Sequence, residues 1–138
     1  MSWLYWALLS AVFAGMTAVL AKKGTEDIDS NLATAIRTTV ILVFAWSIAL
    51  VRNSQPLATV AQRTWLFLVL SGLATGASWL CYFRALQLGD ASSVAPVDKL
   101  SVVVAMALAA LFLHEQLTWQ KWVGGALIVS GTLVIARG

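Results

Sequence analysis

Five long apolar runs make up most of this sequence. A helix needs about 20 mainly apolar residues to cross a membrane, and each run approaches that length. A transmembrane β-barrel would show short segments of alternating hydrophobicity instead. The sequence therefore predicts an all-α membrane protein, a five-transmembrane-helix bundle whose odd number of spans puts the N- and C-termini on opposite sides. The predicted spans cover about residues 2–21, 31–51, 64–88, 92–113 and 118–136.

The composition favours the same class. Hydrophobic residues make up 60% and charged residues 11% of the 138 residues, and the mean hydropathy is +0.85. Soluble domains carry about 25% charged residues, so this chain has too little polar surface to cover a water-soluble globule. We expect residues 1–138 to form a single transmembrane domain.

The polar residues exclude several function classes. The net charge of +3 is carried by dispersed basic residues, which does not indicate a nucleic-acid partner. Cys81 is the only cysteine and His114 the only histidine, which leaves zinc without a set of ligands. The sequence has no nucleophile–base pair and no cofactor loop. It therefore predicts no enzyme activity, no metal and no cofactor.

Local signals give three further expectations. Ser30 is predicted to cap the second helix. Lys22 and Lys23, at the end of the first helix, are predicted to extend toward the lipid headgroups. Pro96 is interpreted as a plain proline in the first turns of the fourth helix. The alternative, a proline kink that takes part in gating, is less favoured.

Orientation depends on the loop cations, because the cytoplasmic side of a membrane protein carries the excess of lysine and arginine. Each side of this bundle has three. The tied count predicts a weak or dual topology, and an odd number of spans without charge bias favours an antiparallel homodimer. The residues counted are Arg52, Arg63 and Lys121 on one side and Lys22, Lys23 and Arg137 on the other.

Four ionisable residues lie within the predicted spans at a similar depth. Arg37, Arg84, Asp98 and Lys99 are roughly 7–12 Å from one face at about 1.5 Å per residue. Ionisable groups inside a membrane are costly and are therefore candidates for function. If Asp98 pairs with Arg84, the other cations can attract an anionic or zwitterionic substrate. The alternative is structural, because long cationic side chains can snorkel and one ion pair can pin a helix hairpin.

Small residues mark predicted helix-packing or dimerisation faces. Gly72 and Gly76 form a GxxxG motif, which lets helix backbones approach closely. Gly124 and Gly131 are seven residues apart, which is two turns on one helix face.

Several short motifs follow one another along the chain. The most specific are Pro96-Val97, near the start of the fourth run, and Glu115-x-Leu117-Thr118, before the fifth. The others are a tryptophan-rich first run ending Ala21-Lys22-Lys23-Gly24, then Tyr82–Leu86, Ala95–Leu100 and Gly124–Gly131. Over nearly the whole chain these residues resemble the EamA-type repeat of the drug/metabolite transporter superfamily.

The resemblance implies how the protein is assembled. Larger members carry two such repeats, inverted, with ten helices in all, so this chain is similar to a stand-alone five-helix repeat whose second half is another copy. The Gly124–Gly131 spacing is also similar to that in the dimerising last helix of small multidrug exporters. Their first helix carries a glutamate that exchanges protons for cationic drugs, whereas residues 2–21 here contain no acidic residue. This departure argues against cation-for-proton antiport.

We therefore expect a multi-pass protein of the bacterial cytoplasmic (inner) membrane. It transports a small molecule, a metabolite or drug, as a homodimer by alternating access. Its expected partners are membrane lipid, a second copy and an anionic or zwitterionic substrate. The alternatives are a flippase for a lipid-linked headgroup and a non-transporting membrane scaffold or accessory subunit.

Overall fold

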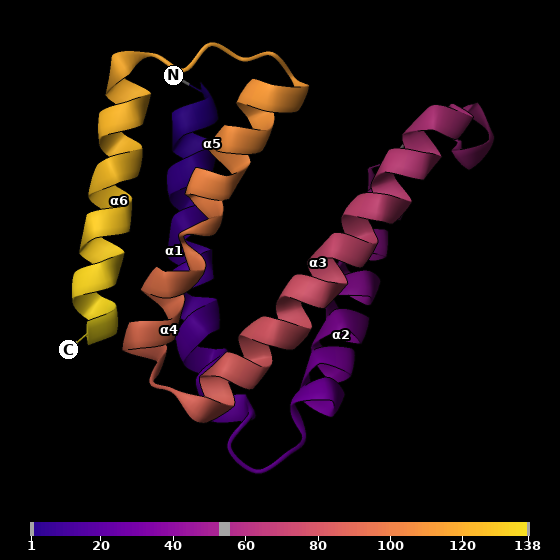
Figure 1. The fold of residues 1–138 in the computed structure, drawn as a ribbon. Coiled ribbons are helices and arrows are strands. Elements are labelled where there is room, and N and C mark those ends of the chain that lie inside the picture. The colour runs from indigo at the N-terminus through magenta and orange to yellow at the C-terminus, as the bar shows by residue number, and fades with distance from the viewer. Residues whose placement is uncertain (1, 53–55, 138) are drawn as a thin grey trace. The chain divides into compact units, whose positions relative to one another are not determined.

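The computed structural model describes residues 2–52 and 56–137, and no strand occurs among them (Figure 1). This confirms the all-α class. The elements are α1 (Ser2–Gly24), α2 (Ser30–Val51), the 3₁₀ turn η1 (Leu57–Thr59), α3 (Gln62–Leu88), α4 (Ala91–Asp98), α5 (Ser101–Phe112) and α6 (Trp119–Arg137).

Four helical stretches in the described part of the chain are long and apolar enough to cross a membrane: Trp3–Gly24, Ser30–Val51, Gln62–Leu88 and Ala91–Phe112. They match the first four predicted spans. α6 is not among them: its 19 residues are long enough, but Gln120 and Lys121 in its first turn and Arg137 at its end lower its mean hydropathy. A fifth span, and termini on opposite sides, therefore remain predictions.

The large apolar side chains of these helices point mostly outward. Leu20 is 68% exposed, Val51 is 84% exposed and Phe112 is 75% exposed. In water such surfaces would drive association, whereas in a bilayer they are the natural contact with lipid tails.

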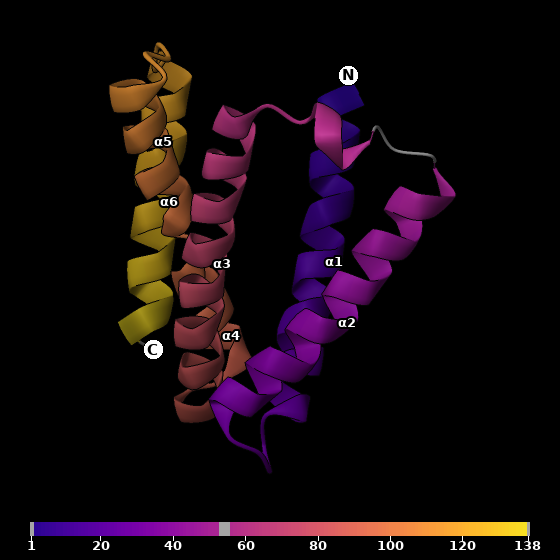
Figure 2. The same cartoon turned by 90° about the vertical axis from the view of Figure 1, so that its right-hand side faces the viewer.

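The chain divides into two compact units, one of Ala21–Leu88 and one of Met1–Leu20 with Gly89–Gly138. In the first unit, Figure 2 shows the start of α2 beside the end of α3, and the other ends of these two helices apart. The buried apolar residues Ala33, Phe83 and Leu86 lie at this meeting point. The packed region of the unit is therefore next to the first loop, residues 25–29.

The N-terminus of α2 is capped one residue earlier than predicted. A carboxylate oxygen of Asp29 accepts hydrogen bonds from the backbone N–H groups of Asn31 at 2.9 Å and Leu32 at 3.2 Å. An aspartate is well suited to this position, since it also interacts favourably with the helix dipole. Ser30 is the first residue of the helix, so its prediction as the cap was wrong.

In the second unit, the predicted fourth helix is broken into α4 and α5. Pro96 lies inside α4, where it supplies no N–H to the preceding turn. Three residues later the chain tightens, and the N–H of Lys99 bonds to the Pro96 carbonyl while that of Leu100 bonds to the Val97 carbonyl, each at 3.0 Å. The interpretation of Pro96 as a plain N-terminal proline was therefore wrong.

α6 packs against α4 and α5 within this unit, and Figure 1 shows it beside α4. The hydroxyl of the buried Thr132 donates to the Pro96 carbonyl at 3.4 Å. Gly125, also buried, lies against Met106 of α5. One stripe of α6, through Gly125 and Thr132, thus faces the rest of its own unit.

Candidate functional site

Arg37 of α2 contacts two aromatic rings of α3. Its guanidinium carbon lies 4.6 Å from the ring centre of Trp79 and 5.4 Å from that of Phe83. The residue is half-buried, and each such cation–π contact is worth about 0.5–2 kcal/mol, depending on desolvation. The structure therefore gives this membrane-embedded arginine a defined orientation.

Arg84 faces a different group of atoms in the same unit. Its guanidinium donates to the side-chain oxygen of Gln87 at 3.1 Å. The Gln87 amide donates in turn to the carbonyls of Thr25, at 3.3 Å, and Ile28, at 2.7 Å. Arg84 is thus connected through Gln87 to the backbone of the first loop.

Lys22 provides a second connection to the end of α3. Its ammonium group donates to the Leu86 carbonyl at 2.7 Å. That carbonyl is among the last four of α3, which have no partner within their own helix, and α3 has no basic residue in its last turn. Lys22 is therefore a C-terminal cap for α3, and the prediction that it extends to the headgroups was wrong.

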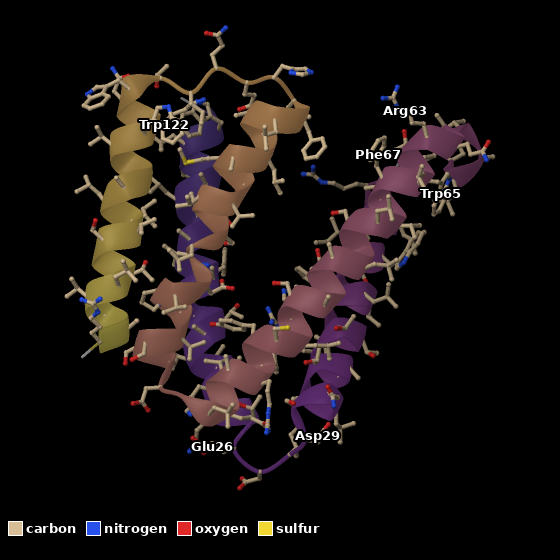
Figure 3. The ribbon with its side chains drawn as sticks, viewed as in Figure 1. Glu26, Asp29, Arg63, Trp65, Phe67 and Trp122 are labelled. Carbon is tan, nitrogen blue, oxygen red and sulfur yellow. The ribbon has the colours of Figure 1, made fainter. Side chains whose placement is uncertain are left out.

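The neighbouring Lys23 behaves differently. Its side chain is 81% exposed and pairs with Glu26, whose position in the loop Figure 3 shows, at 2.9 Å. A small open pocket of about 210 Å³ lies beside Lys22, Thr25, Glu26 and Gln87. We use the name clasp for the hydrogen bonds that Lys22 and Gln87 make between the first loop and the end of α3.

Asp98 and Lys99 lie in the second unit, at the break between α4 and α5. The Asp98 carboxylate pairs with the Lys99 ammonium at 3.3 Å, and the two side chains are 35% and 56% exposed, respectively. Exposed pairs of this kind contribute about 0–1 kcal/mol. Arg37 and Arg84 therefore belong to the first unit, and Asp98 and Lys99 belong to the second. That all four lie at one site stays a prediction.

The four glycines singled out in the sequence have open surroundings. A Cβ built on Gly72, Gly76, Gly124 or Gly131 meets no atom within 4 Å. On α6, Gly124 and Gly131 each precede a buried residue by one position, so they lie about 100° around the helix from the stripe of Gly125 and Thr132. A helix contact through these glycines would therefore use a face that α6 does not use within its own unit.

A small apolar pocket lies between α5 and α6. It has a volume of about 240 Å³ and is lined by Met106, Trp122 and Gly125 among others; Figure 3 shows Trp122 near the start of α6. Within residues 2–52 and 56–137, no three histidine, cysteine, aspartate or glutamate side chains gather as they would around a metal ion.

The apolar helices and the charged residues inside them define a multi-pass helical membrane protein. A family model described as the EamA-like transporter family matches residues 1–137. The chain therefore belongs to the EamA-like transporter family, as the sequence motifs indicated.

Several curated proteins are similar to this chain. An uncharacterized transporter in cobO 3'region of Sinorhizobium sp. is 56% identical over 136 residues, which cover 98% of this chain and 96% of that protein. The uncharacterized transporter YvbV of Bacillus subtilis (strain 168) is 30% identical over 136 residues, which cover 94% of this chain and 43% of that protein.

A third relative has a more specific name. A probable 4-amino-4-deoxy-L-arabinose-phosphoundecaprenol flippase subunit ArnE of Aeromonas salmonicida (strain A449) is 29% identical over 69 residues, which cover 50% of this chain and 60% of that protein. No solved structure matches this chain.

Proposed function

We propose that this protein transports a small polar or amphipathic molecule, a metabolite or drug, across the bacterial cytoplasmic membrane. The observation that supports this most strongly is the family match over residues 1–137, together with a 56% identical relative that is itself named a transporter. The substrate crosses without chemical change, so the proposal requires no catalytic residue and no cofactor.

The transporting unit in this proposal is a homodimer that works by alternating access. The chain matches only 43% of YvbV, about the share that one of two repeats would cover. It matches 96% of the Sinorhizobium relative, so the family contains proteins of about this size. A second copy would supply the other half, with the substrate near the interface of the two.

The two copies are proposed to be antiparallel, because neither side of the predicted bundle carries an excess of loop cations. Reporter fusions at the C-terminus are expected to show both orientations in cells. Adding two lysines to the first loop should make one orientation dominant. A single orientation that added charge does not move would contradict dual topology.

The substrate in this proposal is anionic or zwitterionic. Arg37 and Arg84 supply two guanidinium groups on membrane helices of one unit, and Lys99 supplies a cation beside Asp98 in the other. The two guanidinium groups of the first unit would favour a ligand with at least one negative group.

Flipping of a lipid-linked headgroup is the second candidate. It is favoured by the similarity of half the chain to a probable flippase subunit. A flippase also acts on an amphipathic substrate with a phosphate group, which suits the same cations.

Reconstitution into liposomes tests these functions. Vesicles loaded with a labelled metabolite mixture are expected to exchange label with the same unlabelled compounds faster than protein-free vesicles. For the flippase, a fluorescent polyprenyl phosphate in the outer leaflet should become protected from external quencher. Protein that is folded and inserted but shows neither activity would favour a scaffold or accessory subunit instead.

A further inference from the structure

Arg37 of α2 lies against two aromatic rings of α3. The rings of Trp79 and Phe83 lie 4.6 and 5.4 Å from the guanidinium carbon. An aromatic ring attracts the flat face of a guanidinium but does not accept the N–H groups that point outward in its plane. In the described residues, neither a hydrogen bond nor a carboxylate ion pair reaches these N–H groups.

Two carboxylates of the first loop, those of Glu26 and Asp29, have partners other than Arg37. Glu26 pairs with Lys23 at 2.9 Å, and Asp29 accepts the N–H groups at the start of α2. Arg84, one residue after Phe83, adds a second positive charge to the same helix. The packed end of α2 and α3 therefore carries two guanidinium groups, and one of them lies against two rings with no ion pair to a carboxylate of the described residues.

We propose that Arg37, stacked on Trp79 and Phe83, binds a carboxylate or phosphate group. A carboxylate is planar and a phosphate is tetrahedral, but in either group two oxygens can accept the paired N–H donors on one edge of a guanidinium. The rings fix the plane of the donors in advance, so less side-chain freedom is lost when the anion binds. Calling this anion a substrate rests on the proposed transport function, but its binding does not.

Equilibrium binding to purified protein tests the site. The midpoint of thermal unfolding in an uncharged detergent is measured against the concentration of inorganic phosphate, and separately of acetate, at an ionic strength held constant with sodium chloride. A ligand that binds the folded protein raises the midpoint. The unsubstituted protein is expected to respond saturably to at least one of the two anions.

Two arginine variants decide whether Arg37 is responsible. Arg37→Lys keeps the charge but loses the planar donor pair, and should raise the half-saturating concentration at least about tenfold. Arg63→Lys is the matched control: Arg63 lies 5.7 Å from the ring of Phe67 near the start of α3, where Figure 3 shows both residues, and it is exposed. It should leave binding unchanged.

A third variant keeps the test decisive if Arg37→Lys does not fold. Trp79→Leu retains the guanidinium and removes the closer ring, and should weaken binding by roughly threefold or more. The proposal is overturned if neither anion gives a saturable response, or if folded Arg37→Lys or Trp79→Leu binds as the parent does.

A further experiment with lipid distinguishes a lipid headgroup from a soluble anion as the group that binds. The phosphate titration is repeated in phosphatidylcholine nanodiscs with and without phosphatidylglycerol. A response that phosphatidylglycerol abolishes identifies a lipid headgroup as the occupant, and one that persists identifies a soluble anion; both support the site. Binding without any transport in liposomes would contradict only the proposed function, and transport without binding would contradict only the site.

Discussion

Replacing Lys22 with methionine is expected to lower the free energy of unfolding by about 1.5–3 kcal/mol, the usual worth of a hydrogen bond to a charged group. The substitution removes the ammonium that donates to the Leu86 carbonyl at 2.7 Å, and with it the cation at the negative end of α3. Unfolding by dodecyl sulfate in mixed micelles, followed by far-ultraviolet circular dichroism, measures the change.

Lys23→Met is the matched control, one residue along the chain. Lys23 is 81% exposed and its pairing with Glu26 is a surface ion pair, so its loss should cost about 0.5 kcal/mol or less. Equal effects of the two substitutions would show that Lys22 does not cap α3.

Gln87→Leu tests the other half of the clasp. It leaves the carbonyls of Thr25 and Ile28 without their amide donor, and Thr25 is buried, so a loss of about 1–3 kcal/mol is expected. Gln87→Glu, which keeps the size but has no N–H donors, should be destabilised as well.

Gly131→Leu is expected to weaken self-association at least about tenfold, or on the order of 1.4 kcal/mol, while leaving the fold of the chain intact. A Cβ at Gly131 meets no atom of another part of the chain within 4 Å, so we expect a leucine there to separate this helix from a second copy and leave the contacts within the chain unchanged. Energy transfer between labelled copies, measured as the protein is diluted in liposomes, reports the association.

Gly125→Leu is the contrasting variant on the same helix. A Cβ at Gly125 would lie 3.5 Å from the terminal methyl of Met106, so a leucine there should disturb the packing of α5 on α6 and lower the thermal stability of the chain itself. If Gly131→Leu associates like the parent, Gly131 is not in the interface of the proposed dimer, and Gly72 and Gly76 are the next candidates.

The helices could be predicted from the sequence because membrane spans are set by length and hydrophobicity alone. The interruption of the fourth could not be placed, because a proline near a helix start is compatible with both an N-terminal turn and a break. The missing N–H of Pro96 and the tight turns at Lys99 and Leu100 distinguish the two only in three dimensions.

In the candidate site, too, some residues could be predicted from the sequence and others could not. Arg37 and Arg84 could be singled out as candidates because a charge inside an apolar run is conspicuous, and their role in binding stays a prediction. Lys22 was misread because a lysine at a helix end usually reaches water, and its partner is a backbone carbonyl that no sequence pattern marks. The signal available was indirect: the predicted third helix ends without a cation of its own.

The distance in sequence between Lys22 and its partner has a consequence for how the protein is made. The two residues are 64 positions apart, so at about 5–20 residues per second the ribosome adds Leu86 roughly 3–13 seconds after Lys22. α1 and α2 are both completed within that interval, because α2 ends at Val51, and until Leu86 is added the lysine is solvated by water or headgroups. The clasp therefore cannot decide which way the first two helices enter the membrane; it can only secure an orientation that they have already taken.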